Sequence, residues 1–288
     1  MKFSFVALAV FSMTLTAIAS DKQLKVIYGD DNRLDVFESP NEAYVTLSRS
    51  TAAMVPNSNV RVQGNESVLN GPTMVSRGFC ADERFSHQIT AAMCSGFLVG
   101  DKYLVTAGHC ITSESDCASN KWVFDYKVDD AGQSGVTVAN SSVYSCKRII
   151  SRSLDRLSQD DYAYIELDRA VTDRAPLTFR KTGSIRAGDE ILVIGHPTGL
   201  PTKITDGAKV RALKGKFFTA NLDTYGGNSG SAVFNATTGV VEGILVRGEN
   251  DYISDSRGCR ASNICPENGC RGEDVTYITN IKELMVQQ

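Results

Sequence analysis

The chain has 288 residues and a formal net charge of −3. This length supports a substantial core, arranged as one large all-β domain or as two small barrels that share an interface. The charge balance shows no excess of basic residues, which speaks against a nucleic-acid partner.

Residues 1–19 are predicted to be an export signal. Lys2 supplies the positive start, residues 3–18 are apolar, and residues 17–19 form a small-x-small cleavage site. The apolar run is short for a bilayer span, which favours a cleaved signal over a membrane anchor. We therefore expect a secreted or periplasmic protein without stable membrane association.

Residues 20–77 are predicted to be an N-terminal extension or propeptide, partly packed on the domain that follows. Two short strand-like runs occupy 26–28 and 34–37. The stretch 48–76 is polar and rich in Ser, Asn and Gly, which indicates a linker or loop.

The region from Cys80 onward predicts an all-β sandwich or barrel, because short β-branched and aromatic segments alternate with turn residues. Examples of such strand-like segments are 96–99, 103–106, 122–124, 163–165, 190–194 and 240–246. One short helix is predicted near the C-terminus, with Thr279 or Asn280 as its cap. Its apolar stripe, at i, i+3 and i+4, is Ile281, Leu284 and Met285.

The eight cysteines form an even set in a chain expected to be exported, which favours disulfides. We expect Cys94 and Cys110 to be bonded, because both flank the strand that leads to His109. The pairing of the other six stays open: Cys80, Cys117, Cys146, Cys259, Cys265 and Cys270. The last three could form a metal site, but no histidine lies near them in the sequence. Structural disulfides, without metal, are the favoured interpretation.

A glycine-framed serine is the candidate nucleophile. Ser229 lies in the sequence GGNSGS at 226–231, whose glycines allow a sharp backbone turn. Such a turn lets the amides of Gly227 and Ser229 point at one oxygen, as an oxyanion hole requires. The alternative is a glycine-rich hairpin turn with an incidental serine.

The chain contains three histidines, and His109 is the candidate general acid and base. It lies in the sequence TAGHC at 106–110, tethered by the cysteine that follows. His87 lies in a polar segment without a partner motif and is expected to be structural or exposed. His196 follows a strand and is expected to serve a turn.

Asp161 is the candidate carboxylate that orients the imidazole of His109 and stabilises its charged form. Its neighbour Asp160 is the competitor. The strand 163–167 alternates in polarity, so the two carboxylates should face opposite ways.

These segments occur in the order His, Asp, Ser, the order of chymotrypsin-type enzymes. They resemble the trypsin-like serine peptidase superfamily, and more closely its bacterial glutamyl endopeptidase branch. The branch likeness rests on the motif around Ser229, the turn 195–197, and Val26–Ile27 followed by 31–33. The resemblance implies endopeptidase activity without a cofactor. Its Asp-x-Ala pattern selects Asp161, which leaves Asp160 solvated or capping a turn.

The resemblance also implies two six-stranded antiparallel β-barrels with the active site in the cleft between them. The protease domain is then expected at 78–288, with barrels at about 78–175 and 176–288.

Two residues depart from the family pattern. Asn228 stands where trypsin-like zymogens usually carry an aspartate that pairs with a new amino terminus, so any activation by cleavage works differently here. Candidate processing bonds are Lys25–Val26 and Arg61–Val62. Leu245 stands where the glutamyl branch places the histidine that binds a P1 carboxylate, which argues against a preference for glutamate.

The candidate S1 pocket consists of Asp223, Thr224 and Leu245. Asp223 lies six residues before Ser229, where trypsin-type enzymes carry the aspartate that binds a P1 Arg or Lys. A buried carboxylate there needs a cation, which the substrate would supply. The alternative role for Asp223 is to cap the turn into 226–227.

The sequence thus predicts a secreted serine endopeptidase that hydrolyses protein or peptide substrates through an acyl-enzyme. The alternatives are a toxin-like protease of narrow specificity and a catalytically dead binding module on the same scaffold.

Overall fold

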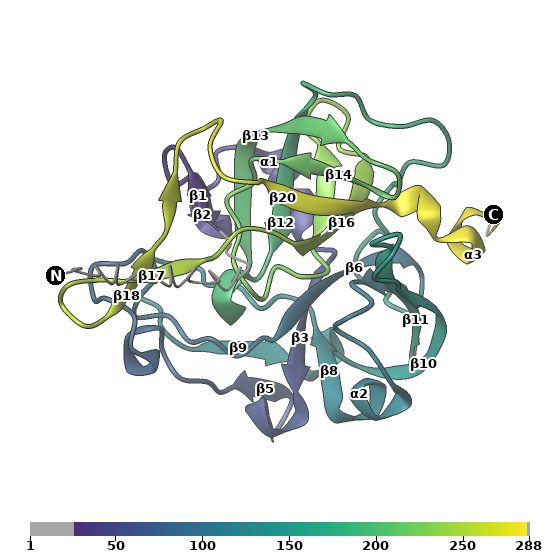
Figure 1. Ribbon diagram of the computed structural model, residues 1–288. Helices are drawn as coiled ribbons and strands as arrows, with labels where there is room; N and C mark the ends of the chain where they lie inside the picture. Colours follow the sequence, from purple (N-terminus) through teal and green to yellow (C-terminus); the bar gives the residue numbers. More distant parts are fainter. Residues whose placement is uncertain (1–25, 287–288) are drawn as a thin grey trace, which may run out of the picture.

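The computed structural model describes residues 26–286 and contains two β-barrels packed side by side. In Figure 1 the strands of the first barrel lie mostly in the lower half of the view and those of the second in the upper half. The predicted all-β class and the two barrels are confirmed. The predicted signal at 1–19 lies outside the described residues.

The first barrel closes through six strands. In spatial order they are β10 (Val143–Leu154), β11 (Asp161–Leu167), β7 (Tyr103–Thr106), β6 (Cys94–Gly100), β3 (Thr51–Pro56) and β8 (Asn120–Val123). Strand β3 pairs with β6 on one side and with β8 on the other. The barrel therefore begins well before residue 78, and the predicted boundary there is too late.

The prediction of a loop at 48–76 is also wrong. Residues 52–55 form a short apolar run that is buried in the barrel, although the residues around it are polar. Further along, β4 (Val60–Gln63), β5 (Glu66–Leu69) and β9 (Val136–Ala139) form a three-stranded sheet. Averaged over the whole stretch, the Ser, Asn and Gly content hid strands of only four to six residues.

The second barrel is a ring of six strands, closed by the pairing of β12 with β13. Its members in order are β12 (Glu190–Gly195), β15 (Ala232–Asn235), β16 (Val241–Arg247), β20 (Glu273–Tyr277), β14 (Phe217–Ala220) and β13 (Lys203–Leu213). A seventh strand, β2 (Arg33–Asp35), pairs with β13. A single apolar cluster runs through both barrels, including Phe97 and Tyr164 of the first and Phe234 and Ile244 of the second.

The N-terminal extension packs on the second half of the chain. Strand β1 (Ile27–Tyr28) pairs in parallel with β19 (Ile264–Cys265), and Val26 and Tyr28 are buried beside Cys265. A separate hairpin joins β17 (Tyr252–Ser254) to β18 (Arg260–Ser262).

The helices are short: α1 (Glu42–Ser48), α2 (Glu114–Ser119) and α3 (Lys282–Met285). The predicted C-terminal helix is confirmed, and the buried side chains of Ile281 and Leu284 anchor it. Its cap is Ile281 rather than Thr279 or Asn280, because a 3-10 turn occupies Ile278–Asn280. Across residues 26–286, no helix has the length and apolar character to cross a membrane.

All eight cysteines are in disulfides. The predicted Cys94–Cys110 bond is confirmed, and the other pairs are Cys80–Cys259, Cys117–Cys146 and Cys265–Cys270. The sulfurs of the C-terminal cysteine cluster are thus bonded to carbon and sulfur, so they do not act as thiolate ligands for a metal.

Candidate active site

His109 lies on a tight turn after β7. A side chain at Gly108 would place its Cβ 1.9 Å from the carbonyl oxygen of Ser153, so only glycine fits there. The disulfide from Cys110 to Cys94 then ties this turn to strand β6. The local sequence therefore fixes His109 at the rim of the first barrel.

Asp161, the first residue of β11, binds His109 at two points. Its Oδ2 lies 2.8 Å from Nδ1 of the imidazole, and its Oδ1 accepts the backbone N–H of His109 at 3.1 Å. The carboxylate side chain is 5% exposed and the imidazole 35%. An acceptor at Nδ1 favours the tautomer that leaves Nε2 unprotonated, as a general base requires.

Asp160 bonds to the C-terminal segment rather than to His109. It is buried, and its Oδ1 accepts a hydrogen bond of 2.8 Å from Nδ2 of Asn280. Burial raises the pKa of Asp160 above its ordinary value. The expectation that this residue is solvated or caps a turn is therefore wrong.

Ser229 lies in the sharp turn before β15, where the glycines are sterically required. Gly227 has φ +99°, and a Cβ there would lie 2.5 Å from the carbonyl oxygen of His196. Gly230 has φ +90°, and its Cβ would lie 2.0 Å from the carbonyl oxygen of Ser95 and 2.2 Å from Oγ1 of Thr106. The Ser229 turn therefore packs closely against the two strands that lead to His109.

Two further contacts place Ser229 beside the histidine turn. The backbone N–H of Ser95 donates to the carbonyl oxygen of Ser229 at 2.8 Å, and Sγ of Cys110 lies 3.6 Å from that oxygen. Ser229 thus adjoins the disulfide that follows His109, at the junction of the barrels.

Two adjoining cavities open along this junction. One, of about 350 Å³, is lined by His109 and Asp161, and the other, of about 240 Å³, is lined by Gly226 and Ser229. Both are bordered by Val246 and Arg247 at the end of β16. The three candidates therefore line two neighbouring cavities, which share Val246 and Arg247 as a common border.

The residues predicted to form the S1 pocket line neither of these cavities. Oδ1 and Oδ2 of Asp223 accept the backbone N–H groups of Tyr28 and Asn32, at 2.7 and 3.1 Å. Burial raises the pKa of Asp223 to about 7. Leu245 is buried in the core of the second barrel, and the Thr224 hydroxyl donates to Glu273. The carboxylate of Asp223 thus faces the N-terminal segment. This geometry does not fit the predicted contact between Asp223 and a P1 side chain.

Residues that no sequence motif singled out form the wall of the cavity beside Ser229. Glu249 and Asp251 line it, and the carboxylate of Glu273 lies directly behind Gly248, where a Cβ would be 1.8 Å from Oε2. Glu273 also accepts the backbone N–H of Glu249 at 3.0 Å. These residues come from the irregular connection after β16, for which no local motif exists.

Arg247 was also missed, although it borders both cavities. Its guanidinium donates to Oδ2 of Asp274 at 3.0 Å and to the carbonyl oxygen of Gln159 at 2.9 Å, and it lies 4.0 Å from Oδ2 of Asp161. It thus adds positive charge next to the carboxylate that orients His109.

The other histidines agree with their predicted roles. His87 is exposed. His196 is fully buried, donates from Nδ1 to the carbonyl oxygen of Leu200 at 3.1 Å and stacks on Tyr126. Burial lowers the pKa of His196 to about 3, so this imidazole is neutral and serves the turn 196–199.

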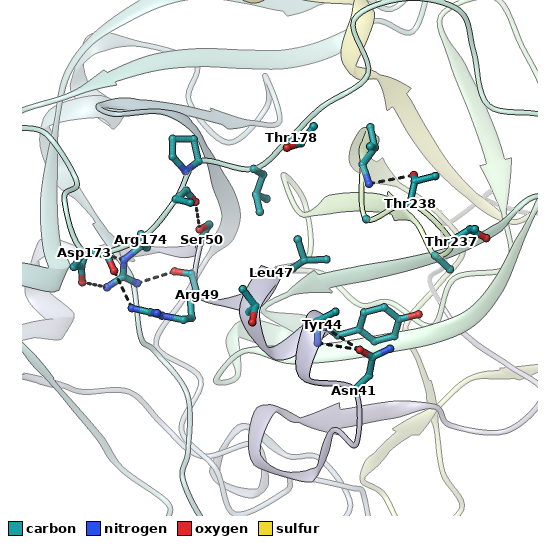
Figure 2. A pocket seen from close by; sticks show the side chains of 18 residues that line it. Asn41, Tyr44, Leu47, Arg49, Ser50, Asp173, Arg174, Thr178, Thr237 and Thr238 are labelled. Carbon is teal, nitrogen blue, oxygen red and sulfur yellow. Dashed lines mark hydrogen bonds and ion pairs between the residues drawn. The ribbon is translucent and has the colours of Figure 1, made fainter.

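A separate cavity, of about 1110 Å³, lies away from these two. Figure 2 shows its lining, which comes from α1, the segment 173–178 and the turn 236–240. The charge of Arg174 there is compensated by Asp125 and Asp173. None of the three catalytic candidates lines this cavity.

Comparison with known proteins identifies the fold and the family. Residues 94–244, just over half of the chain, match the trypsin-like peptidase domain. Among solved structures, a Glu endopeptidase in complex with MPD has a TM-score of 0.52 at 16% identity, covering 90% of this chain and 97% of that one. The VesB protease of Vibrio cholerae has a TM-score of 0.53 at 17% identity, covering 90% and 66%.

Two curated relatives extend the match. Glutamyl endopeptidase of Bacillus licheniformis is 25% identical over 204 residues, which cover 69% of this chain and 62% of that protein. Trypsin Blo t 3 of Blomia tropicalis is 27% identical over 195 residues, which cover 64% and 68%. This chain thus spans less than two thirds of the length of the Bacillus relative. The resemblance found in the motifs is confirmed, and the chain belongs to the trypsin-like peptidase domain family.

Proposed function

We propose that this protein is a serine endopeptidase in which His109, Asp161 and Ser229 form the catalytic triad. The observation that carries the proposal is the 2.8 Å contact between Nδ1 of His109 and the buried carboxylate of Asp161, on a turn that packs against the Ser229 loop. Family membership supports the same activity.

In the proposed reaction, Oγ of Ser229 attacks the peptide carbonyl while Nε2 of His109 takes its proton. Asp161 stabilises the resulting imidazolium, and the amides of Gly227 and Ser229 donate to the oxyanion. His109 then protonates the leaving amine, which departs and leaves an acyl-enzyme. Water, activated by the same histidine, hydrolyses the ester and restores Ser229.

We further propose a preference for Arg or Lys at P1. Three carboxylates support it: Glu249 and Asp251 line the cavity beside Ser229, and Glu273 lies behind its wall. A cationic side chain entering this cavity gains charge-assisted hydrogen bonds to these carboxylates, whereas the guanidinium of Arg247 at its border already bonds to Asp274 and Gln159. This proposal replaces Asp223 as the recognition residue but keeps the predicted substrate class.

The natural substrates are proposed to be proteins or peptides outside the cytoplasm. Four disulfides in the described residues favour an oxidising compartment, in keeping with the export signal predicted from the sequence.

The test combines a fluorophosphonate probe with a peptide library profiled at P1. The wild type is expected to be labelled and to cleave after Arg or Lys, and Ser229→Ala to lose both properties, with turnover lower by up to about 10⁶-fold. An unlabelled wild type would indicate a dead binding module. Labelling without cleavage of any library peptide would favour a protease of narrow specificity.

A further inference from the structure

The orientation of one peptide group decides whether Gly227 can serve as an oxyanion donor. The Gly226–Gly227 peptide is flanked by two glycines, so its rotation meets little steric resistance. Within residues 26–286 all peptides are trans, and a trans peptide points its N–H and C=O in opposite directions. Whatever holds the carbonyl of Gly226 therefore sets the direction of the Gly227 N–H.

Thr198 holds that carbonyl. Its backbone N–H donates to the carbonyl oxygen of Gly226 at 2.5 Å, which turns the N–H of Gly227 away from the turn 196–199. Thr198 does so from a left-handed conformation, with φ 60° and ψ 6°. This conformation is unfavourable for a β-branched residue and persists only where surrounding contacts impose it.

Two side chains impose it. The Thr198 hydroxyl bonds to the hydroxyl of Tyr252, and the Arg77 guanidinium donates to the carbonyl oxygen of Thr198 at 3.0 Å. The strained turn is thus anchored at both its side chain and its backbone.

Ser95 holds the next peptide. Its hydroxyl donates to the carbonyl oxygen of Gly227 at 2.8 Å and accepts the backbone N–H of His196 at 3.0 Å. Its own N–H donates to the carbonyl oxygen of Ser229 at 2.8 Å. Ser95 belongs to β6 of the first barrel and is fully buried, so it joins the barrel that carries His109 to the loop that carries the nucleophile.

We infer that Ser95 and Thr198 are positioning residues that fix the peptides on either side of Gly227 before substrate arrives. Neither side chain touches the reacting atoms; both act through the amide of Gly227. The inference rests on the proposed function, because it assigns these residues to the oxyanion hole of the proposed triad. Preorganised donors of this kind act most strongly on the transition state.

The first test compares Ser95→Ala with the matched control Ser50→Ala. Ser50 is also buried, and its hydroxyl donates to the carbonyl oxygen of Ala175 at 2.6 Å, away from the cleft. For Ser95→Ala we expect kcat on a peptide substrate to fall by roughly 10- to 100-fold, with KM nearly unchanged. Affinity for a peptide aldehyde, which forms a tetrahedral adduct, should fall in parallel. Ser50→Ala should keep both properties.

The second test uses two substitutions of Thr198 and stays informative if Ser95→Ala does not fold. Thr198→Val removes the hydroxyl anchor and keeps the β-branch, so the left-handed turn should relax and kcat should fall. Thr198→Gly adopts the left-handed conformation readily and keeps the N–H, so it should retain at least about tenfold more kcat than Thr198→Val.

Different outcomes would overturn the proposed function and the positioning roles of Ser95 and Thr198. A wild type without probe labelling or hydrolysis overturns the proposed function. An active wild type whose Ser95→Ala variant keeps kcat and aldehyde affinity overturns the role of Ser95. If Thr198→Gly has a lower kcat than Thr198→Val, the role of Thr198 is overturned. That order is expected if the Thr198 side chain contributes only through its packing.

Discussion

The carboxylate of Asp161 holds His109 by both its imidazole and its backbone: Oδ2 lies 2.8 Å from Nδ1 and Oδ1 accepts the main-chain N–H. The same group therefore sets the tautomer of the imidazole and the shape of the turn that carries it. Asp161 makes this double contact, whereas its neighbour Asp160 bonds to Asn280. Replacing the two residues should therefore affect catalysis differently.

Asp161→Asn is expected to lower kcat by about 10⁴-fold, because an amide N–H facing Nδ1 favours the tautomer with a protonated Nε2. Asp160→Asn is the matched control, since its side-chain oxygen can still accept from Asn280. Steady-state kinetics on the best library peptide provides the measurement. Equal losses in the two variants would contradict the assigned role of Asp161.

Asp223 is expected to make the protein less stable as the pH rises. Its folded pKa of about 7 lies above its ordinary value of 3.8, so its contribution is fully present below pH 3.8 and is lost as the pH rises through about 7. Asp223→Asn lacks this titration, although it loses one of the two N–H contacts. The free energy of unfolding of the wild type, relative to Asp223→Asn, should therefore fall between pH 5 and pH 8. A constant difference in urea unfolding at the two pH values would rule out this titration.

Gly230→Ala should be strongly destabilising. Gly188 has a similar φ, +88°, but open space around its Cβ position, so Gly188→Ala measures backbone strain alone, about 1–2 kcal/mol. Gly230→Ala adds a clash with the carbonyl oxygen of Ser95 and should cost more than about 3 kcal/mol. Chemical unfolding of both variants provides the comparison. Equal costs would show that the loop can move away from β6.

The buried pair of Lys203 and Asp35 should respond differently to single and double replacement. Nζ of Lys203 lies 2.5 Å from Oδ1 of Asp35, with side chains 0% and 4% exposed. Asp35→Ala leaves a buried ammonium with its charge uncompensated and should cost about 3–5 kcal/mol. Combining it with Lys203→Met should recover part of that loss. Additive losses in a double-mutant cycle would show that the two charges are not coupled.

Local features of the sequence were sufficient for the triad candidates and for half of the barrel strands, namely β6, β7, β8, β11, β12 and β16. Gly108, Gly227 and Gly230 are required by close backbone approaches. Such a requirement is visible in the sequence as a glycine at the position itself. The Asp-x-Ala pattern that selects Asp161 over Asp160 is likewise local to one segment. The strands within 48–76 were not predicted, because they are short and turn residues dominate the composition of that stretch.

What the sequence by itself determined is therefore the set of catalytic candidates, Ser229, His109 and Asp161 with their glycine frame, each marked by a short-range pattern. The tertiary structure alone decided which distant groups meet. Asp223 bonds to Tyr28 across 195 positions, Ser95 to Gly227 across 132, and Cys80 to Cys259 across 179. The physical reason is that such contacts depend on how the two barrels close and pack, and no single segment carries that information.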